Sequence, residues 1–216
     1  MIKKINGSQY ENIYVCGDIH GCFSLLEQKL LDVNFNKDKD LLVCTGDLID
    51  RGPESHLAPQ YIAYNWFESV LGNHEDMCIN NLTHYHYVED QDAFIAALES
   101  LPLAITISLP NSLVGVIHAA VPGDCWDSLE KFKSGEPASW GFSSFDCCIW
   151  DRKDFNAANP NKFVSNIDHV YFGHNIVKEI TTVANKTYLD TGAWVSVLHP
   201  KVAKTDGYDL TLLKIK

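Results

Sequence analysis

The sequence predicts a mixed α/β (α+β) fold in which two β-sheets are flanked by helices. In the first half, short apolar runs typical of strands alternate with helical segments in the order β-α-β-α-β. The second half has several strand-like runs in closer succession, which indicates a second sheet. Hydrophobic residues make up 46% of the chain, enough for a sizeable core, and we expect residues 1–216 to form one domain.

The first half contains three predicted strands, each followed by a helix. Ile13–Cys16 and Leu41–Thr45 are apolar strands, and the second is a continuous run of the kind buried on both faces. The stretch Cys22–Val33 places Leu26 and Leu30 at helical spacing. Right-handed crossovers would make the strands parallel. The remaining predicted elements are a helix from Pro53 to about Tyr64, a strand at Trp66–Leu71 and a helix from Glu75 to about Leu82.

The second half is predicted to add an amphipathic helix, an irregular region and further strands. Asp90–Ser100 carries Phe94 and Leu98 at helical spacing. Ala119–Pro160 is rich in Trp, Gly and Ser, with a helix expected near Phe142–Trp150. Strands are expected at Leu103–Leu109, Val114–His118, Val170–Phe172, Thr181–Ala184, Thr187–Leu189 and Tyr208–Ile215, with Asn185-Lys186 as a two-residue hairpin turn.

The composition limits the partners and the compartment. The balance of 17 Lys+Arg against 28 Asp+Glu gives a net charge of −11, which argues against a nucleic-acid groove and against an anionic membrane surface. It does not argue against a phosphate substrate, because bound metals would reverse the local field. The chain has seven cysteines without CxxC spacing, no N-terminal signal segment and no apolar run long enough to span a membrane. We therefore expect a reducing cytoplasm as the compartment. The oligomeric state does not follow from the sequence, and a monomer is the default expectation.

Polar residues follow the first three predicted strands directly. The strings are Gly17-Asp18-Ile19-His20-Gly21, Gly46-Asp47-Leu48-Ile49-Asp50-Arg51-Gly52 and Gly72-Asn73-His74-Glu75. Two later strands finish in His118 and His174. Strand ends on one edge of a sheet can bring these groups together, and their carboxylate, imidazole and amide donors suit Mn, Fe, Zn or Co. Asp47 could bridge two such ions, and a metal pair sharing an Asp cleaves phosphoesters.

Hydrolysis needs a nucleophile, an acid and cations for the phosphate. A water between the two metals could act as the nucleophile. His74 follows Asn73 directly and is the natural general acid for the leaving oxygen, with Asp50 holding it in orientation. Arg51 and Arg152 offer the bidentate fork that suits phosphate.

Each of these features has a structural alternative when it is taken alone. An Asp-x-His pair is usually a surface pair, and a histidine at a strand end is more often structural than a ligand. The common placement of all the residues after apolar strands favours the functional interpretation. We assign no site role to the other histidines (His56, His84, His86, His169 and His199), and we expect Trp126, Trp140 and Trp150 to belong to the core or a rim.

The strings GDIHG, GDLIDRG and GNHE resemble the signature of the PPP-type Ser/Thr protein phosphatases, within the calcineurin-like metallophosphoesterases. The small bacterial and phage members, of the lambda-phage protein phosphatase type, are the most similar. The string Leu189-Asp190-Thr191-Gly192-Ala193 also looks similar to them, and the likeness is weakest over about Cys125–Asn166. The resemblance implies a calcineurin-like metallophosphoesterase fold, with a central β-sandwich flanked by helices.

The resemblance also implies roles for the site residues. It places one metal on Asp18, His20 and Asp47, and a second on Asp47, Asn73, His118 and His174. It implies Mn²⁺ as the usual activating metal, His74 as acid paired with Asp50, and Arg51, Arg152 and Asn73 at the substrate. The expected substrates are phosphoproteins or phosphopeptides carrying phosphoserine or phosphothreonine, with phosphotyrosine and phosphohistidine also open.

Two alternatives remain open. Symmetrical dinucleoside tetraphosphate hydrolases have a similar metal core, but they typically lack the acid at the position of Asp50 and carry Asp where this chain has Glu75. An inactive scaffold that only recognises phosphoproteins is the other alternative, although no expected ligand is missing. The chain departs from the protein phosphatases at Leu71, Asn175-Ile176 and Trp194–Asp206, which leaves substrate preference open.

Overall fold

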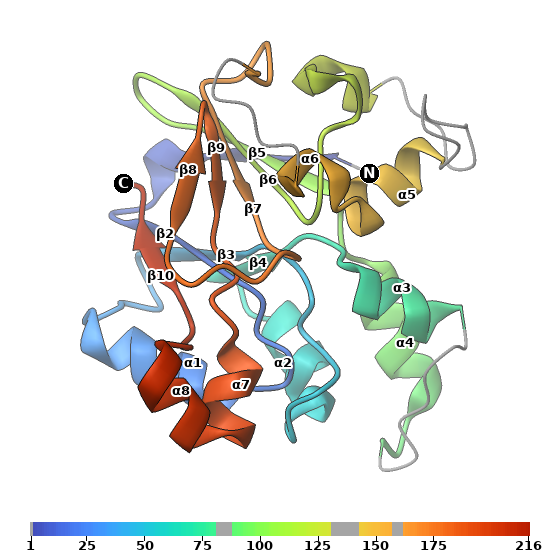
Figure 1. Cartoon of the computed structure of the whole chain (residues 1–216), viewed down its shortest axis with the longest axis vertical. Helices are drawn as coiled ribbons and strands as arrows, with labels where there is room; N and C mark the ends of the chain where they lie inside the picture. The colour runs from blue at the N-terminus through green and yellow to red at the C-terminus, as the bar shows by residue number, and fades with distance from the viewer. Residues whose placement is uncertain (1, 81–87, 131–142, 157–161) are drawn as a thin grey trace.

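The computed structural model describes residues 2–80, 88–130, 143–156 and 162–216 (Figure 1). Two β-sheets pack face to face, and helices cover their outer faces. This arrangement confirms the predicted mixed α/β class with two sheets. The predicted positions at His84, His86 and Trp140 lie outside the described residues.

The smaller sheet has four strands in the order β10-β2-β3-β4. Its strands are β2 (Ile13–Cys16), β3 (Leu41–Cys44), β4 (Phe67–Ser69) and β10 (Leu212–Lys214). The first three are parallel, as predicted from their helical crossovers, and β10 joins β2 in the antiparallel direction. Their carboxyl ends therefore lie at one edge, from which the loops lead to α1 (Phe23–Asp32), α2 (Ala58–Ile62) and α3 (Asn73–Ile79).

The larger sheet has six strands in the order β1-β5-β6-β7-β9-β8. They are β1 (Ile2–Asn6), β5 (Ala104–Ser108), β6 (Leu113–Ile117), β7 (His169–Phe172), β8 (Thr181–Val183) and β9 (Lys186–Tyr188). Strands β6 and β7 run parallel to each other. The predicted hairpin turn is displaced by one residue, because Lys186 already pairs with Val183 and the turn falls on Ala184-Asn185.

Three apolar clusters hold the layers together. Ile13 and Val15 of β2 face the larger sheet in the central cluster, whereas Tyr14 and Cys16 face the helices, so the strand alternates between two buried faces. The third cluster packs Trp126 and neighbouring residues against the outer face of the larger sheet. This burial on both faces explains why the strands of the smaller sheet read as continuous apolar runs.

The remaining helices lie around this sandwich. They are α4 (Gln91–Glu99), α5 (Ser144–Trp150), α6 (Lys153–Asn156), α7 (Ala193–Leu198) and α8 (Pro200–Asp206), with short 3₁₀ turns at Gly7–Gln9, Ser55–Leu57, Pro122–Asp124 and Trp126–Glu130. Helices α4 and α5 match the sequence prediction closely. The pair α7–α8 was not predicted, and it packs on the side of the smaller sheet near α1 (Figure 1). Among the described residues, every helix is too short or too polar to cross a membrane.

Candidate active site

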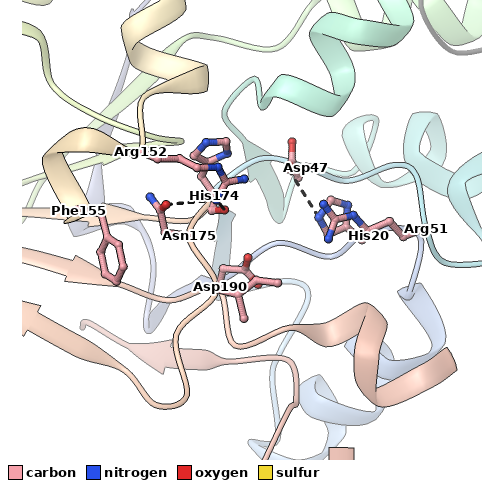
Figure 2. Close-up of a pocket in the computed structure, with 9 residues that line it drawn as sticks. His20, Asp47, Arg51, Arg152, Phe155, His174, Asn175 and Asp190 are labelled. Carbon is pink, nitrogen blue, oxygen red and sulfur yellow. Dashed lines mark hydrogen bonds and ion pairs between the residues drawn. The ribbon is translucent and has the colours of Figure 1, made fainter. Parts of the chain in front are cut away.

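All of the predicted site residues meet where loops leave the carboxyl ends of strands in both sheets. Asp18, Asp47 and Asn73 follow strands β2, β3 and β4 of the smaller sheet. His118 and His174 follow β6 and β7, which are parallel neighbours in the larger sheet. The two sheets face each other, so side chains from both reach the same space, and Figure 2 shows several of them around one pocket.

Asp47 lies between two histidines whose facing nitrogens carry no proton. The Nδ1–H of His118 donates to the carbonyl oxygen of Thr45 at 2.8 Å, and that of His20 donates to the carbonyl oxygen of Ile49 at 2.9 Å. Burial lowers the pKa of both histidines well below the usual value, so both are neutral. Their Nε2 atoms therefore present lone pairs, at 3.5 Å from Asp47 Oδ1 for His118 and at 3.6 Å from Asp47 Oδ2 for His20.

The side-chain oxygen of Asn73 places a further lone pair close to those of the histidines. Asn73 Oδ1 lies 3.0 Å from His118 Nε2 and 2.9 Å from His174 Nδ1. The Nε2 atom of His174 is buried without a hydrogen-bond partner among the described residues. Burial and, second, the negative charge of Glu75 raise the pKa of Asp47 to about 8. A cation bound beside this carboxylate would therefore stabilise its ionised form. Neutral imidazoles, a carboxylate and an amide oxygen form the donor set of a divalent-metal site, and the residues fit one.

Two groups of ligand atoms lie close enough for one ion each. His20, Asp47 and His74 form one group and Asp47, His118 and His174 form the other, so Asp47 is common to both. The first group thus contains His74 in place of Asp18, which the resemblance implies as a ligand; the hydrogen bond from His74 to Asp50 favours a protonated ring, and a protonated ring cannot bind a metal. Asp18 is buried beside them, where its oxygens accept the Thr45 hydroxyl proton and the His174 backbone N–H, each at 2.9 Å. Each carboxylate oxygen has a second lone pair, so these hydrogen bonds leave Asp18 able to bind a cation.

His74 and Asp50 form a tightly coupled pair at the edge of this cluster. His74 Nδ1 lies 2.6 Å from Asp50 Oδ2, and its Nε2 lies 3.9 Å from Asp47 Oδ2. Burial lowers the pKa of His74, but the hydrogen bond to Asp50 and the charges of both carboxylates outweigh it and raise the pKa above its usual value. The imidazole therefore holds a second proton on Nε2 to a higher pH than an ordinary histidine does, which favours a role as general acid.

Two guanidinium groups line the same pocket, a cavity of about 300 Å³ (Figure 2). Arg152 Nη1 donates to the carbonyl oxygen of His174 at 3.0 Å and to Asn175 Oδ1 at 3.2 Å. Arg51 Nη2 lies 3.4 Å from His74 Nε2. Carboxylate, imidazole and two guanidinium groups thus line one cavity, and the forked donors of guanidinium suit phosphoryl oxygens.

The loops that carry the site adopt left-handed backbone conformations at several non-glycine residues. The φ angles are 46° at His20, 51° at Asp47, 69° at Asp50, 68° at Arg51 and 64° at His174. Such angles are rare outside glycine and cost free energy that the surrounding structure has to supply. They turn the chain sharply after β2, β3 and β7, where the loops bring their side chains into the site.

Glu75 is a structural residue of the site whose contacts sequence reasoning missed. Its side chain is fully buried and accepts hydrogen bonds from four backbone N–H groups: Gly72 (2.9 Å), Asp47 (2.9 Å), Leu48 (2.8 Å) and Ile49 (3.2 Å). Only the first of these contacts is local. The sequence indicated an acid in the first turn of a helix, but the bonds to the second loop are long-range. Asp190 was also missed as part of the site: it lies buried in the pocket wall and accepts the N–H of Gly192 at 2.9 Å.

We expect Glu75→Gln to lower the free energy of unfolding by about 2–3 kcal/mol, because an amide cannot accept all of the hydrogen bonds that the carboxylate receives. Urea denaturation of the metal-free protein measures the change. The matched control is Glu11→Gln, which removes a charge from a side chain that is 61% exposed and paired with Lys39, and should cost less than about 1 kcal/mol. Equal stability losses in the two variants would remove the special role of Glu75.

Comparisons with known proteins agree with this geometry. Residues 11–178 match the sequence family described as calcineurin-like phosphoesterase. Serine/threonine-protein phosphatase 2 of Salmonella typhimurium is 32% identical over 212 residues, covering 89% of this chain and 92% of that protein. A symmetrical bis(5'-nucleosyl)-tetraphosphatase of Hamiltonella defensa is 48% identical, but over 64 residues that make up 29% of this chain.

A similar fold occurs in a solved structure, the cold-active protein-tyrosine phosphatase of a Shewanella species. It superimposes with a TM-score of 0.63 at 18% identity, covering 98% of this chain and 77% of that one. At this level of identity, the likeness extends to the fold alone.

Proposed function

The chain belongs to the calcineurin-like phosphoesterase family, and on that premise we propose that it is a protein phosphatase that depends on two divalent metal ions. The proposed substrates are phosphoproteins or phosphopeptides carrying phosphoserine or phosphothreonine, with phosphotyrosine and phosphohistidine also open. The observation that carries this proposal is the position of Asp47, whose two oxygens each face the unprotonated Nε2 of a different histidine. Similarity to bacterial serine/threonine phosphatases over most of the chain supports the substrate class.

The metal-binding residues are assigned by donor chemistry and by the family resemblance. Asp18, His20 and Asp47 would hold one ion, and Asp47, Asn73, His118 and His174 the other. The mixed oxygen and nitrogen donors suit Mn²⁺, our first choice, as well as Fe, Zn or Co. When bound, the ions supply Lewis acidity that activates water and neutralises phosphoryl charge.

The remaining residues hold the substrate and move the proton. Arg51 and Arg152 would donate hydrogen bonds to the phosphoryl oxygens and so orient the ester in the pocket. Nε2 of His74 donates its proton to the leaving oxygen, so that an alcohol rather than an alkoxide departs. Asp50 fixes the imidazole through its hydrogen bond to Nδ1, 2.6 Å long, and stabilises the protonated ring before the transfer.

A side-by-side assay tests the proposal. Metal-depleted protein is reloaded with Mn²⁺, Fe²⁺, Zn²⁺ or Co²⁺ and supplied with p-nitrophenyl phosphate, a phosphoserine peptide, a phosphotyrosine peptide and diadenosine tetraphosphate. We expect hydrolysis of the phosphomonoesters, its loss with chelator and its return with Mn²⁺. Turnover of the dinucleotide alone would favour the tetraphosphate hydrolase instead. No turnover of any substrate with any of the metals would favour a scaffold.

The second phosphate contact is tested at Arg152. We expect Arg152→Ala to lower kcat/KM for p-nitrophenyl phosphate by about ten- to a hundredfold, since it removes a charge-assisted hydrogen bond. Arg152→Lys keeps the charge but loses the fork and should lie between the wild type and the alanine variant. Asn175→Ala removes one bond that positions Arg152, 3.2 Å long, and should have a smaller effect of the same kind. Steady-state kinetics that do not separate these variants would exclude Arg152 from substrate binding.

We also propose that residues 1–216 form one domain that acts as a monomer in the cytoplasm. The support for a single domain is that β10, near one end of the chain, pairs with β2, near the other. All seven cysteines lie within the described residues and none forms a disulfide, which suits a reducing compartment. Limited proteolysis and light scattering test the first two statements.

A further inference from the structure

Arg51 is held differently from Arg152. Its side chain is exposed, and it follows Asp50 on a left-handed turn of the loop after β3. Its contacts among the described residues are His74 Nε2, at 3.4 Å from Nη2, and the ring of Trp194, whose centre lies 4.8 Å from Cζ. Arg152, by contrast, uses its Nη1 atom to donate to a carbonyl and a side-chain amide.

Trp194 reaches Arg51 because of the way in which α7 begins. Gly192 adopts a φ of 76°, and a Cβ atom there would lie 2.7 Å from the ring of Tyr208, so this turn requires glycine. The neighbouring Ala193 and Val195 are buried and anchor the first turn of the helix. Trp194 is thereby fixed beside Arg51, which lines the pocket.

The indole of Trp194 gives up a hydrogen bond in this position. Its Nε1 atom is buried and has no partner among the described residues, which costs free energy for a group that normally finds an acceptor when it is buried. The contact with Arg51 offsets this cost, because a guanidinium over the face of a tryptophan is attracted by the π-electrons. The ring therefore interacts with its neighbour through its face.

Stacking restrains a guanidinium without consuming its donors. A carboxylate would hold Arg51 by accepting hydrogen bonds from its N–H groups. An aromatic face contacts the plane of the guanidinium instead, so the N–H groups at its edge can still donate. An exposed arginine on a loop otherwise loses side-chain entropy when it binds phosphate, and prior restraint reduces this loss. The benefit is expected in substrate binding more than in the chemical step.

From these contacts we propose that Trp194 is a positioning residue, which holds the guanidinium of Arg51 ready for the phosphoryl group of the substrate. The proposal rests on the function proposed above. It explains how Arg51, which forms no ion pair with any described residue, is restrained at the end of a left-handed loop, and it assigns a role to a residue outside all of the sequence motifs.

The test compares Trp194→Leu, which removes the aromatic face, with Trp194→Phe, which keeps one. Mn²⁺-loaded enzyme is assayed with p-nitrophenyl phosphate, and inorganic phosphate is titrated as a competitive inhibitor. We expect the leucine variant to raise KM and the inhibition constant of phosphate by about two- to fivefold with a smaller change in kcat, and the phenylalanine variant to stay closer to the wild type. Leu198→Ala, at a side chain of α7 that is 43% exposed, is the control and should change neither constant.

A double-variant cycle separates positioning from structural damage. In the Arg51→Ala background, Trp194→Leu should weaken phosphate inhibition no further, because the residue through which it acts is gone. An equal loss in both backgrounds, or no loss in either, overturns the proposal. If the leucine variant does not fold, Trp194→Met keeps apolar volume without a ring and takes its place in the cycle.

The failure of this proposal can be told apart from the failure of the proposed function. If the wild type hydrolyses p-nitrophenyl phosphate but the cycle shows no coupling, Trp194 has no positioning role and the phosphatase assignment stands. If the wild type hydrolyses no phosphomonoester, the assignment falls. Calorimetric titration of the Mn²⁺-loaded proteins with inorganic phosphate then measures the coupling directly, and equal affinities in wild type and Trp194→Leu would refute it.

Discussion

Replacing His74 by asparagine is expected to slow hydrolysis of a phosphoserine peptide on the order of 10²–10⁴-fold while metal binding is retained. The reason is that Nε2 of His74 is the group placed to protonate the leaving oxygen, and Asp50 holds the ring from the other side at 2.6 Å. Steady-state kinetics and metal analysis of the same preparation measure the two quantities. A rate equal to that of the wild type would exclude His74 from the mechanism.

The leaving group provides an internal control for this variant. The alkoxide of serine needs a proton far more than p-nitrophenolate does, so His74→Asn should lose more activity toward the peptide than toward p-nitrophenyl phosphate. A general loss of structure would lower both rates by the same factor. His56→Asn, at an exposed histidine of the 3₁₀ turn Ser55–Leu57, is the matched substitution and should leave both rates unchanged.

The second large effect is expected for Asp47→Asn, which should lose both metal ions and nearly all activity. A single carboxylate serves both groups of ligand atoms, so one substitution weakens two sites at once. Metal analysis after dialysis should find well under one ion per molecule, against two in the wild type. Retention of two tightly bound ions would refute the bridging role of Asp47.

Stability measurements separate this metal loss from misfolding. The pKa of Asp47 is raised to about 8, chiefly by burial, so ionisation of this carboxylate opposes folding in the metal-free protein once the pH rises above the ordinary pKa near 4. Asparagine removes the ionisable group and can still accept the His74 N–H, which lies 3.0 Å from Oδ1. With chelator present at neutral pH, the variant should therefore melt no lower than the wild type, whereas added Mn²⁺ should stabilise the wild type alone.

The sequence predicted the parts of the fold in which consecutive residues follow a clear apolar pattern. Leu41–Cys44 is apolar at every position because both faces of β3 are buried, and such a run leaves little choice of structure. Strand β1 was missed because Lys3 and Lys4 interrupt its apolar pattern, which an edge strand with exposed positions tolerates. Helix α8 was also missed, although a proline at its first position and Gly207 after its end mark its boundaries.

The site was predictable to the extent that its residues follow strands directly. Polar residues immediately after apolar runs indicated where the loops converge, and the structure brings His118 and Asp47 together from different sheets. Contacts between residues that are far apart in the sequence leave no such pattern. Neither the bond from Leu48 N–H to Glu75 nor the stacking of Arg51 on Trp194 follows from any local regularity, because each depends on how separate loops pack.

The left-handed residue Arg51 has a consequence for laboratory evolution. A glycine at this position would adopt the same φ of 68° without steric penalty and would relieve strain in the loop. A selection for heat resistance alone would therefore tend to enrich glycine here and discard a side chain that we propose binds the substrate. Libraries built from this protein should be screened for turnover at every round, because the residue that favours thermal stability at this position differs from the residue that favours catalysis.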